Sequence, residues 1–200
     1  MAEPRRKLRD ASELRVLAHP VRLRLLQVLN ERGAATATEV AELIGESPAN
    51  CSWHLRQLAK YGFVEETGGG RGRQRPWRPT RQTLQWGDSD ESGAVAAASD
   101  ELTATLLEQE FAGLRSWLAW WRTDPPDWRD AASLGQTHTW LTVEELAEVN
   151  AEITAILLRH RERMRDPAKR PAAARRIRMF AWAVPADPLP SRRPGPGDDS

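Results

Sequence analysis

The chain has 200 residues, of which 40% are hydrophobic and 28% are charged, which is enough apolar material for one large domain or two small ones. A single cysteine excludes a disulfide-rich scaffold and any zinc site built from several thiolates. No apolar run approaches the roughly 18 residues of a membrane helix, and the charged start MAEPRRKLRD lacks the apolar stretch of a secretory signal. We therefore expect a cytoplasmic protein.

The net charge of +1 conceals three segments of different sign. Residues 1–82 carry a net charge of +6, residues 83–168 carry −9, and residues 169–200 carry +4. A basic front joined to an acidic middle predicts that the front meets a polyanion and that the middle lies away from it.

Two helices are expected after a flexible basic leader over residues 1–9. The first covers residues 10–18, where leucines recur at helical spacing. Pro20 ends this helix and begins the next, because the residue before a proline leaves the helical region and proline itself suits a first helical turn. Gly33 closes the second helix.

Two further helices follow, with a turn between them. Residues 36–45 begin with the Thr-x-x-Glu spacing of a capping box, and Ser-Pro starts a helix over residues 47–61. In that last helix Cys51, Leu55 and Leu58 recur at i, i+4 and i+7, which predicts its buried face.

A hairpin is predicted next. Residues 63–67 have the composition of a short strand, residues 68–72 form a glycine-rich tip, and residues 74–80 return as a second strand that its prolines confine to an edge. The order of helix, helix, short helix, turn, helix and hairpin predicts a winged helix-turn-helix domain.

The second half of the chain is expected to be mainly helical. Two amphipathic patterns cover residues 100–122 and 142–165, and an apolar run over residues 177–184 predicts one extra strand. The fold class is therefore mainly α with a small β-hairpin. The expected parts are the leader (1–9), the winged helix-turn-helix domain (10–85), a linker (86–99), a helical dimerisation and effector module (100–185) and a disordered tail (186–200). Residues 87–99 are alternatively the frayed start of the helix that follows.

The front domain has the residues that DNA recognition requires. A recognition helix needs an apolar face for docking and a face of hydrogen-bonding groups for base edges, and a wing needs glycines and cations that follow the DNA backbone. The predicted DNA-binding residues are Ser47, Ala49, Asn50, Ser52, Trp53, His54, Arg56, Gln57, Lys60, Arg71, Arg73 and Arg75.

Two segments resemble the ArsR-type family of bacterial transcriptional regulators. They are LRVLAHPVRLRLLQVL over residues 14–29 and TATEVAELIGESPANCSWHLRQLAKYGFVEE over residues 36–66. The resemblance covers roughly residues 10–80. It implies a homodimer, a DNA site with twofold symmetry, and repression that a signal relieves.

The metal-sensing motifs of that family are missing. Its metal sensors carry a Cys-x-Cys stretch or paired acidic and histidine ligands, whereas this chain has only Cys51, and His138 and His160 lack matching acidic partners. Cys51 and His54 have a ligand spacing, but two ligands do not make a site, and Cys51 is better explained as a core residue. We expect no metal and no cofactor. Without any catalytic motif, we also expect no enzyme.

Nine of the 13 aromatic residues are tryptophans, and five of them lie near the junction of the two long helices. The favoured interpretation is a hydrophobic core and dimer interface. The alternative is an aromatic effector pocket formed by Trp117, Trp120, Trp121, Trp128 and Trp140.

The sequence thus predicts a sequence-specific DNA-binding transcriptional regulator, a dimeric repressor of the ArsR type without that family's metal site. The expected partners are double-stranded DNA with an inverted repeat, a second copy of the chain and a small-molecule effector, with no membrane. The alternative is a winged-helix module that binds a ligand or a protein without specific DNA recognition. The wing discriminates between them, because a protein-binding version has little need of alternating arginines there.

Overall fold

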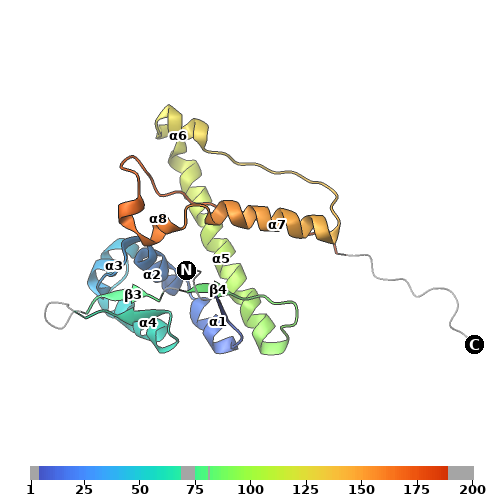
Figure 1. Cartoon of the computed structure of the whole chain (residues 1–200). Helices are drawn as coiled ribbons and strands as arrows, with labels where there is room; N and C mark the ends of the chain where they lie inside the picture. Colours follow the sequence, from blue (N-terminus) through green and yellow to red (C-terminus); the bar gives the residue numbers. More distant parts are fainter. Residues whose placement is uncertain (1–4, 69–74, 81, 189–200) are drawn as a thin grey trace, which may run out of the picture. The chain divides into compact units, whose positions relative to one another are not determined.

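The computed structural model describes residues 5–68, 75–80 and 82–188 (Figure 1). Its contacts divide the chain into two units. The first contains residues 1–133 and 162–170, and the second contains residues 134–161 and 171–200. None of the helices in the described part of the chain has the length and hydrophobicity needed to cross a bilayer.

The first unit begins with the helices that the sequence predicts. Their bounds are Ala11–Leu17 for α1, Pro20–Arg32 for α2, Ala37–Ile44 for α3 and Pro48–Lys60 for α4. The side chains before each helix satisfy its unpaired N–H groups. Asp10, His19, Thr36 and Ser47 accept hydrogen bonds from the first turns of α1, α2, α3 and α4 respectively, and Thr36 and Glu39 form the predicted capping box.

The predicted hairpin is confirmed. Strand β2, Val64–Glu66, pairs antiparallel with β3, Trp77–Pro79. Trp77 is 7% exposed and exchanges two backbone hydrogen bonds with Ala35, of 2.8 and 2.9 Å, which joins the hairpin to the segment before α3. The glycine-rich tip lies outside the described residues.

A second strand pair corrects the prediction of a flexible leader over residues 1–9. Strand β1, Arg5–Lys7, pairs in parallel with β4, Thr83–Gln85, and the next residue, Leu8, is 1% exposed in the core. The Arg6 guanidinium donates a hydrogen bond to the Tyr61 carbonyl at 2.9 Å. The leader prediction is therefore wrong from residue 5 onward, because one apolar side chain and a backbone ladder fix the segment in place.

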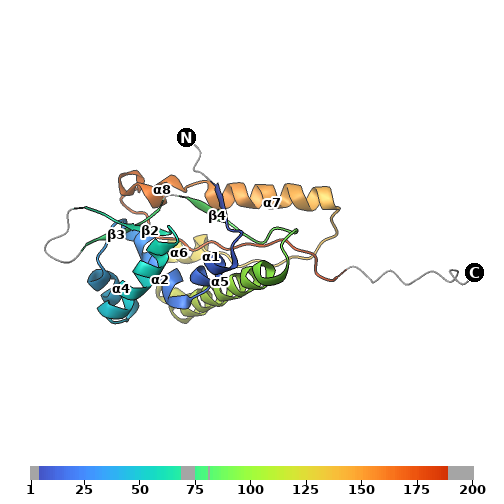
Figure 2. The same ribbon diagram turned by 90° about the horizontal axis from the view of Figure 1, so that it is seen from below.

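The long helix of the first unit starts earlier than expected. Helix α5 spans Gly93–Trp120, and its N-terminal half packs along α1 (Figure 2). Ala98, Ser99 and Leu102 are buried there, so the predicted linker over residues 86–99 is wrong from Gly93. The 3₁₀ turn η1, Trp121–Thr123, and helix α6, Pro126–Ala131, follow α5.

The second unit contains one helix, α7, among its described residues, with bounds Val143–Leu158. Thr142 and Glu145 form the predicted capping box at its start. The helix ends before the predicted residue 165. Helix α8, Glu162–Arg165, and the 3₁₀ turn η2, Pro167–Lys169, come next and belong to the first unit.

The strand predicted over residues 177–184 is not formed in the structure, which has no β-ladder in that range. Its apolar side chains are exposed, for example Ile177 at 60% and Trp182 at 60%. The side-chain amide of Asn150 in α7 donates a hydrogen bond to the Ala183 carbonyl of this segment at 3.2 Å. An apolar run specifies a strand only when another strand lies beside it.

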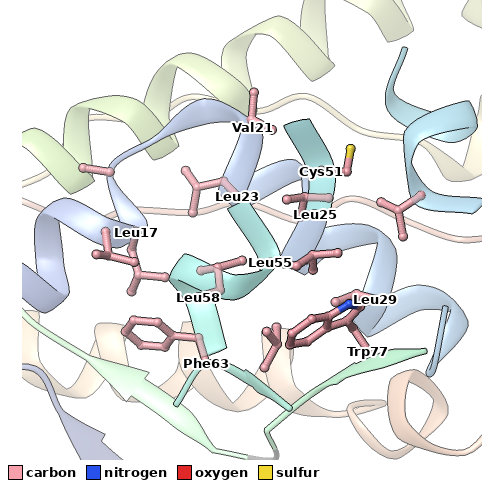
Figure 3. Packing of buried hydrophobic residues seen from close by; sticks show 14 of the residues in the cluster. Leu17, Val21, Leu23, Leu25, Leu29, Cys51, Leu55, Leu58, Phe63 and Trp77 are labelled. Atoms are coloured by element: carbon pink, nitrogen blue, oxygen red, sulfur yellow. The ribbon is translucent and has the colours of Figure 1, made fainter. Parts of the chain in front are cut away.

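The core of the first unit lies between α1, α2, α4 and the hairpin (Figure 3). Leu25 and Leu29 of α2 meet Leu55 and Leu58 of α4, and all four side chains are 0% exposed. Cys51 is equally buried, and burial raises the pKa of its thiol. The predicted buried stripe of α4 is therefore confirmed.

A polar pair crosses the same interface. Arg22 of α2 is 9% exposed, and its guanidinium donates to the Val16 carbonyl at 3.0 Å and to Nδ1 of His54 at 3.2 Å. His54 of α4 is 3% exposed and must be neutral at Nδ1 to accept this bond. The pKa of His54 is lowered to about 4, first by burial and then by the neighbouring His19 and Arg22.

Leu8→Ala should lower the free energy of unfolding of the first unit by about 2–5 kcal/mol, because it empties a core position. Urea denaturation measures this change. Leu134→Ala is the matched control, since Leu134 is 71% exposed, and it should change stability by less than about 0.5 kcal/mol. Equally small effects of the two variants would show that the segment after β1 is not docked in solution.

Stability should fall as the pH is lowered from about 6.5 to 4, because the unfolded chain protonates His54 in this range while the folded state does not. More than about one pH unit above 6.5, both states hold His54 neutral and its contribution is constant. The slope due to His54 reaches about 1.4 kcal/mol per pH unit. His54→Gln can still accept from Arg22 and should have a shallower slope in urea denaturation at pH 7, 6 and 5. Parallel profiles for the two proteins would contradict the burial of a neutral ring.

Candidate nucleic-acid interface

Helix α4 presents one continuous outer face. Ala49, Trp53, Arg56 and Lys60 are all exposed and recur at i, i+4, i+7 and i+11, so that they line one side of the helix. We call these four residues the outer stripe. The buried stripe lies on the opposite side of α4. The outer stripe combines a small, an aromatic and two cationic side chains, which suits contact with base edges and phosphates.

Three predicted residues flank the outer stripe. Asn50, Ser52 and Gln57 are half-buried. The Asn50 amide donates to a carboxylate oxygen of Glu46 at 3.0 Å, and the other oxygen of Glu46 pairs with Arg24 at 3.1 Å. Asn50 is therefore held by the turn between α3 and α4, and it must exchange this partner to reach a base.

The turn itself is fixed by α2. Besides its ion pair with Glu46, the Arg24 guanidinium donates to the Ile44 carbonyl at the end of α3, at 3.2 Å. Ser47 is exposed and caps α4 by accepting from the Asn50 N–H at 3.2 Å. These contacts set the angle at which α4 leaves the turn.

The structure places His54 in the interior rather than beside the outer stripe. Its ring packs against His19, with centroids 4.5 Å apart, and binds Arg22. His54 is therefore a core residue of α4, because a 3% exposed ring cannot reach DNA.

The stem of the wing carries two cross-strand ion pairs. Arg75 contacts Glu66 at 3.0 Å and Arg78 contacts Glu65 at 2.8 Å. All four side chains are more than one third exposed, so these pairs are of the kind that salt and competing anions readily break. Arg71 and Arg73 of the predicted wing lie outside the described residues.

The predicted tryptophan pocket is brought together only in part. Trp117 and Trp121 stack with their ring centroids 5.6 Å apart, and Arg122 lies 4.8 Å from the Trp121 ring. Trp120 is 42% exposed and Trp128 is half-buried on α6. Trp140 belongs to the second unit and is 96% exposed.

Among the residues that the structure describes, no three histidine, cysteine, aspartate or glutamate side chains lie close enough to hold a metal ion. Cys51, the cysteine of the chain, faces the core.

Sequence reasoning missed the roles of Arg22, Arg24 and Glu46. Two arginines on the second helix are equally compatible with phosphate contact and with a solvated face. The available signal concerns Arg22, which stands between two apolar residues, Val21 and Leu23: a helix that is covered on several sides buries such an arginine with a polar partner.

Residues 17–67 match the family model of a helix-turn-helix domain. None of the curated proteins is similar in sequence. A transcriptional regulator homologue from Pyrococcus horikoshii OT3 is similar in structure, with 21% identity, coverage of 50% of this chain and 87% of that one, and a TM-score of 0.31. The transcriptional repressor BigR from Xylella fastidiosa has 30% identity, coverage of 50% of this chain and 85% of that one, and a TM-score of 0.32. The YusO protein from Bacillus subtilis has 19% identity, coverage of 74% of this chain and 80% of that one, and a TM-score of 0.33.

These TM-scores are too low to establish a common overall architecture. The family match stands without them, because it covers α2, α3, α4 and the start of the hairpin. Residues 17–67 are a helix-turn-helix domain, and with the hairpin of β2 and β3 they form a winged helix.

Proposed function

We propose that this protein is a sequence-specific DNA-binding transcriptional regulator, a dimeric repressor of the ArsR type that works in the cytoplasm without a metal. Helix α4 enters the major groove with its outer stripe, and the wing lies along the adjacent backbone. The surface includes Ser47, Ala49, Asn50, Ser52, Trp53, Arg56, Gln57, Lys60, Arg71, Arg73 and Arg75.

The outer stripe of α4 is the observation that carries this proposal. A helix that is only structural can leave any polar residues outward, whereas this one leaves a tryptophan and two cations in line, on the helix that a helix-turn-helix domain uses for recognition. The helix is also held rigidly by α2, which suits a reading surface.

A second copy of the chain is the partner that the apolar side of α5 favours. In its C-terminal half, Phe111 is 38% exposed and Leu118 is 48% exposed, with Leu114 and Trp117 half-buried beside them. Burial of this side against its symmetry mate would bring two α4 helices to one inverted repeat. The stacked Trp117 and Trp121 support that interface, or a small-molecule effector that binds beside it.

The ion pairs of the wing stem favour the alternative module, which binds a protein or ligand without specific DNA recognition, because they neutralise Arg75 of the proposed surface and Arg78 beside it. Selection of binding sites from a random duplex library distinguishes this alternative module from a sequence-specific regulator.

Selection of binding sites from a random duplex library by the purified full chain, at near-physiological salt, tests the proposed function. We expect enrichment of an inverted repeat with half-sites about one helical turn apart, as dimeric helix-turn-helix proteins require. Failure to enrich any sequence, with only weak and salt-sensitive binding, would favour the alternative module.

The wing is tested within that experiment. The triple variant Arg71→Ala, Arg73→Ala and Arg75→Ala should weaken binding to all duplexes and reduce the salt slope by about one for each phosphate contact removed. The matched control removes three arginines from the second unit, at Arg175, Arg176 and Arg178, with the same change in net charge. If both triple variants bind alike, net charge rather than the wing accounts for the affinity.

Leu118→Asp should convert the dimer to a monomer, because an unpaired carboxylate buried in the interface costs on the order of 3 kcal/mol, or about a hundredfold in the dissociation constant. Sedimentation velocity measures the molecular mass. Ala112→Asp is the control, since Ala112 is exposed on another side of α5. A dimer that survives Leu118→Asp would exclude this side of α5 as the interface.

A further inference from the structure

A half-exposed tryptophan occupies the middle of the outer stripe of α4. Trp53 is 47% exposed, with Ala49 one turn before it and Arg56 one turn after it. An indole ring offers one N–H donor and a large apolar surface. Such a side chain gains nothing from exposure to water, so its position on the outer side of a recognition helix calls for a specific contact.

Two buried groups hold the ring of Trp53. The guanidinium carbon of Arg22 lies 5.5 Å from its centroid, a cation–π distance, and the His54 ring meets it edge-on at 4.7 Å. Arg22 is itself held by its hydrogen bonds to His54 and to the Val16 carbonyl. The inner side of the indole is therefore fixed by α2 and the core of α4, while the rest of the ring remains outside.

We propose that Trp53 is a specificity-determining residue that reads the C5 methyl group of a thymine in the major groove. This inference rests on the DNA-binding function proposed above. The thymine methyl is the apolar feature that the base pairs present in the major groove, and it matches the exposed part of an indole. Because the ring is already oriented, it loses little side-chain freedom on contact.

The neighbours of Trp53 offer less apolar surface for this contact. Ala49 ends at Cβ and reaches less far, and the cationic heads of Arg56 and Lys60 favour phosphates or the acceptors of guanine. Trp53 is therefore the side chain of the outer stripe best suited to recognise the methyl group, and its contribution can be separated by mutation.

The test replaces thymine by deoxyuridine, one position at a time, in both half-sites of the duplex obtained by site selection. This change removes the C5 methyl group and leaves the hydrogen-bonding edges intact. Wild-type protein should lose about fourfold in affinity per methyl group at one thymine position, the value of one buried carbon. Trp53→Ala should bind the thymine duplex more weakly and should bind the thymine and uracil duplexes equally.

Two further variants sharpen the test. Trp53→Gln is polar and favours a helix, so it should also lose the preference for thymine, and it replaces the alanine variant if that chain is not folded by circular dichroism. Arg56→Ala is the matched control on the same stripe, and it should lower the affinity while it keeps the ratio between thymine and uracil duplexes.

The outcomes separate this inference from the proposed function. If no sequence is enriched, the proposed function fails and this inference with it. If a site is enriched but no thymine gives wild-type protein a ratio above about twofold, the DNA-binding function stands and the reading of a methyl group is overturned. A ratio that persists in the Trp53 variants, or is lost equally in Arg56→Ala, overturns the assignment to Trp53.

Discussion

The packing of α4 against α2 is the interaction on which the rest of the winged helix depends. Leucines from both helices exclude water between them, and Arg22 crosses the same interface to bind His54. Buried leucines set the distance between two helices, but rotation or sliding of one helix against the other then costs little free energy. A hydrogen-bonded pair between the helices requires one register. The combination fixes which side of α4 faces outward, and the outer stripe follows from it.

A second set of polar contacts, donated by Arg24 to Ile44 and Glu46 and by Asn50 to Glu46, performs the same task at the turn between α3 and α4. Both sets start from arginines on α2. Helix α2 thus orients the recognition helix through two arginines. Arg22 fixes the rotation of α4 about its axis, and Arg24 fixes the turn from which α4 begins.

Local signals explain why residues 10–66 could be predicted closely from the sequence. The capping residues Asp10, Thr36 and Ser47 act within one turn of chain, so they are visible without knowledge of the fold. Strands β1 and β4 were missed because they are three residues long and pair across nearly the whole domain. The sequence left the start of α5 open between a linker and a helix, because its alanine-rich first turns have little periodicity and only burial against α1 identifies them as helix.

The candidate site was predicted less completely, and for a physical reason. Exposure on α4 follows from helical periodicity, so Ala49, Trp53, Arg56 and Lys60 could be assigned. Residue type suggested that His54 would be near the surface, yet burial of a polar side chain depends on its partner, and that partner is an arginine 32 positions earlier. Pairwise contacts of this kind leave no pattern in either segment alone.

The ion pairs of the wing stem have a consequence for discrimination between DNA sequences. Glu65 and Glu66 are anions attached to the same hairpin as the arginines they contact. A phosphate that takes Arg75 or Arg78 must displace a tethered carboxylate, which stays nearby and repels the backbone. The hairpin therefore gains less from any duplex than its arginine content suggests, and the contacts made by α4, which depend on the sequence, supply a larger share of the affinity.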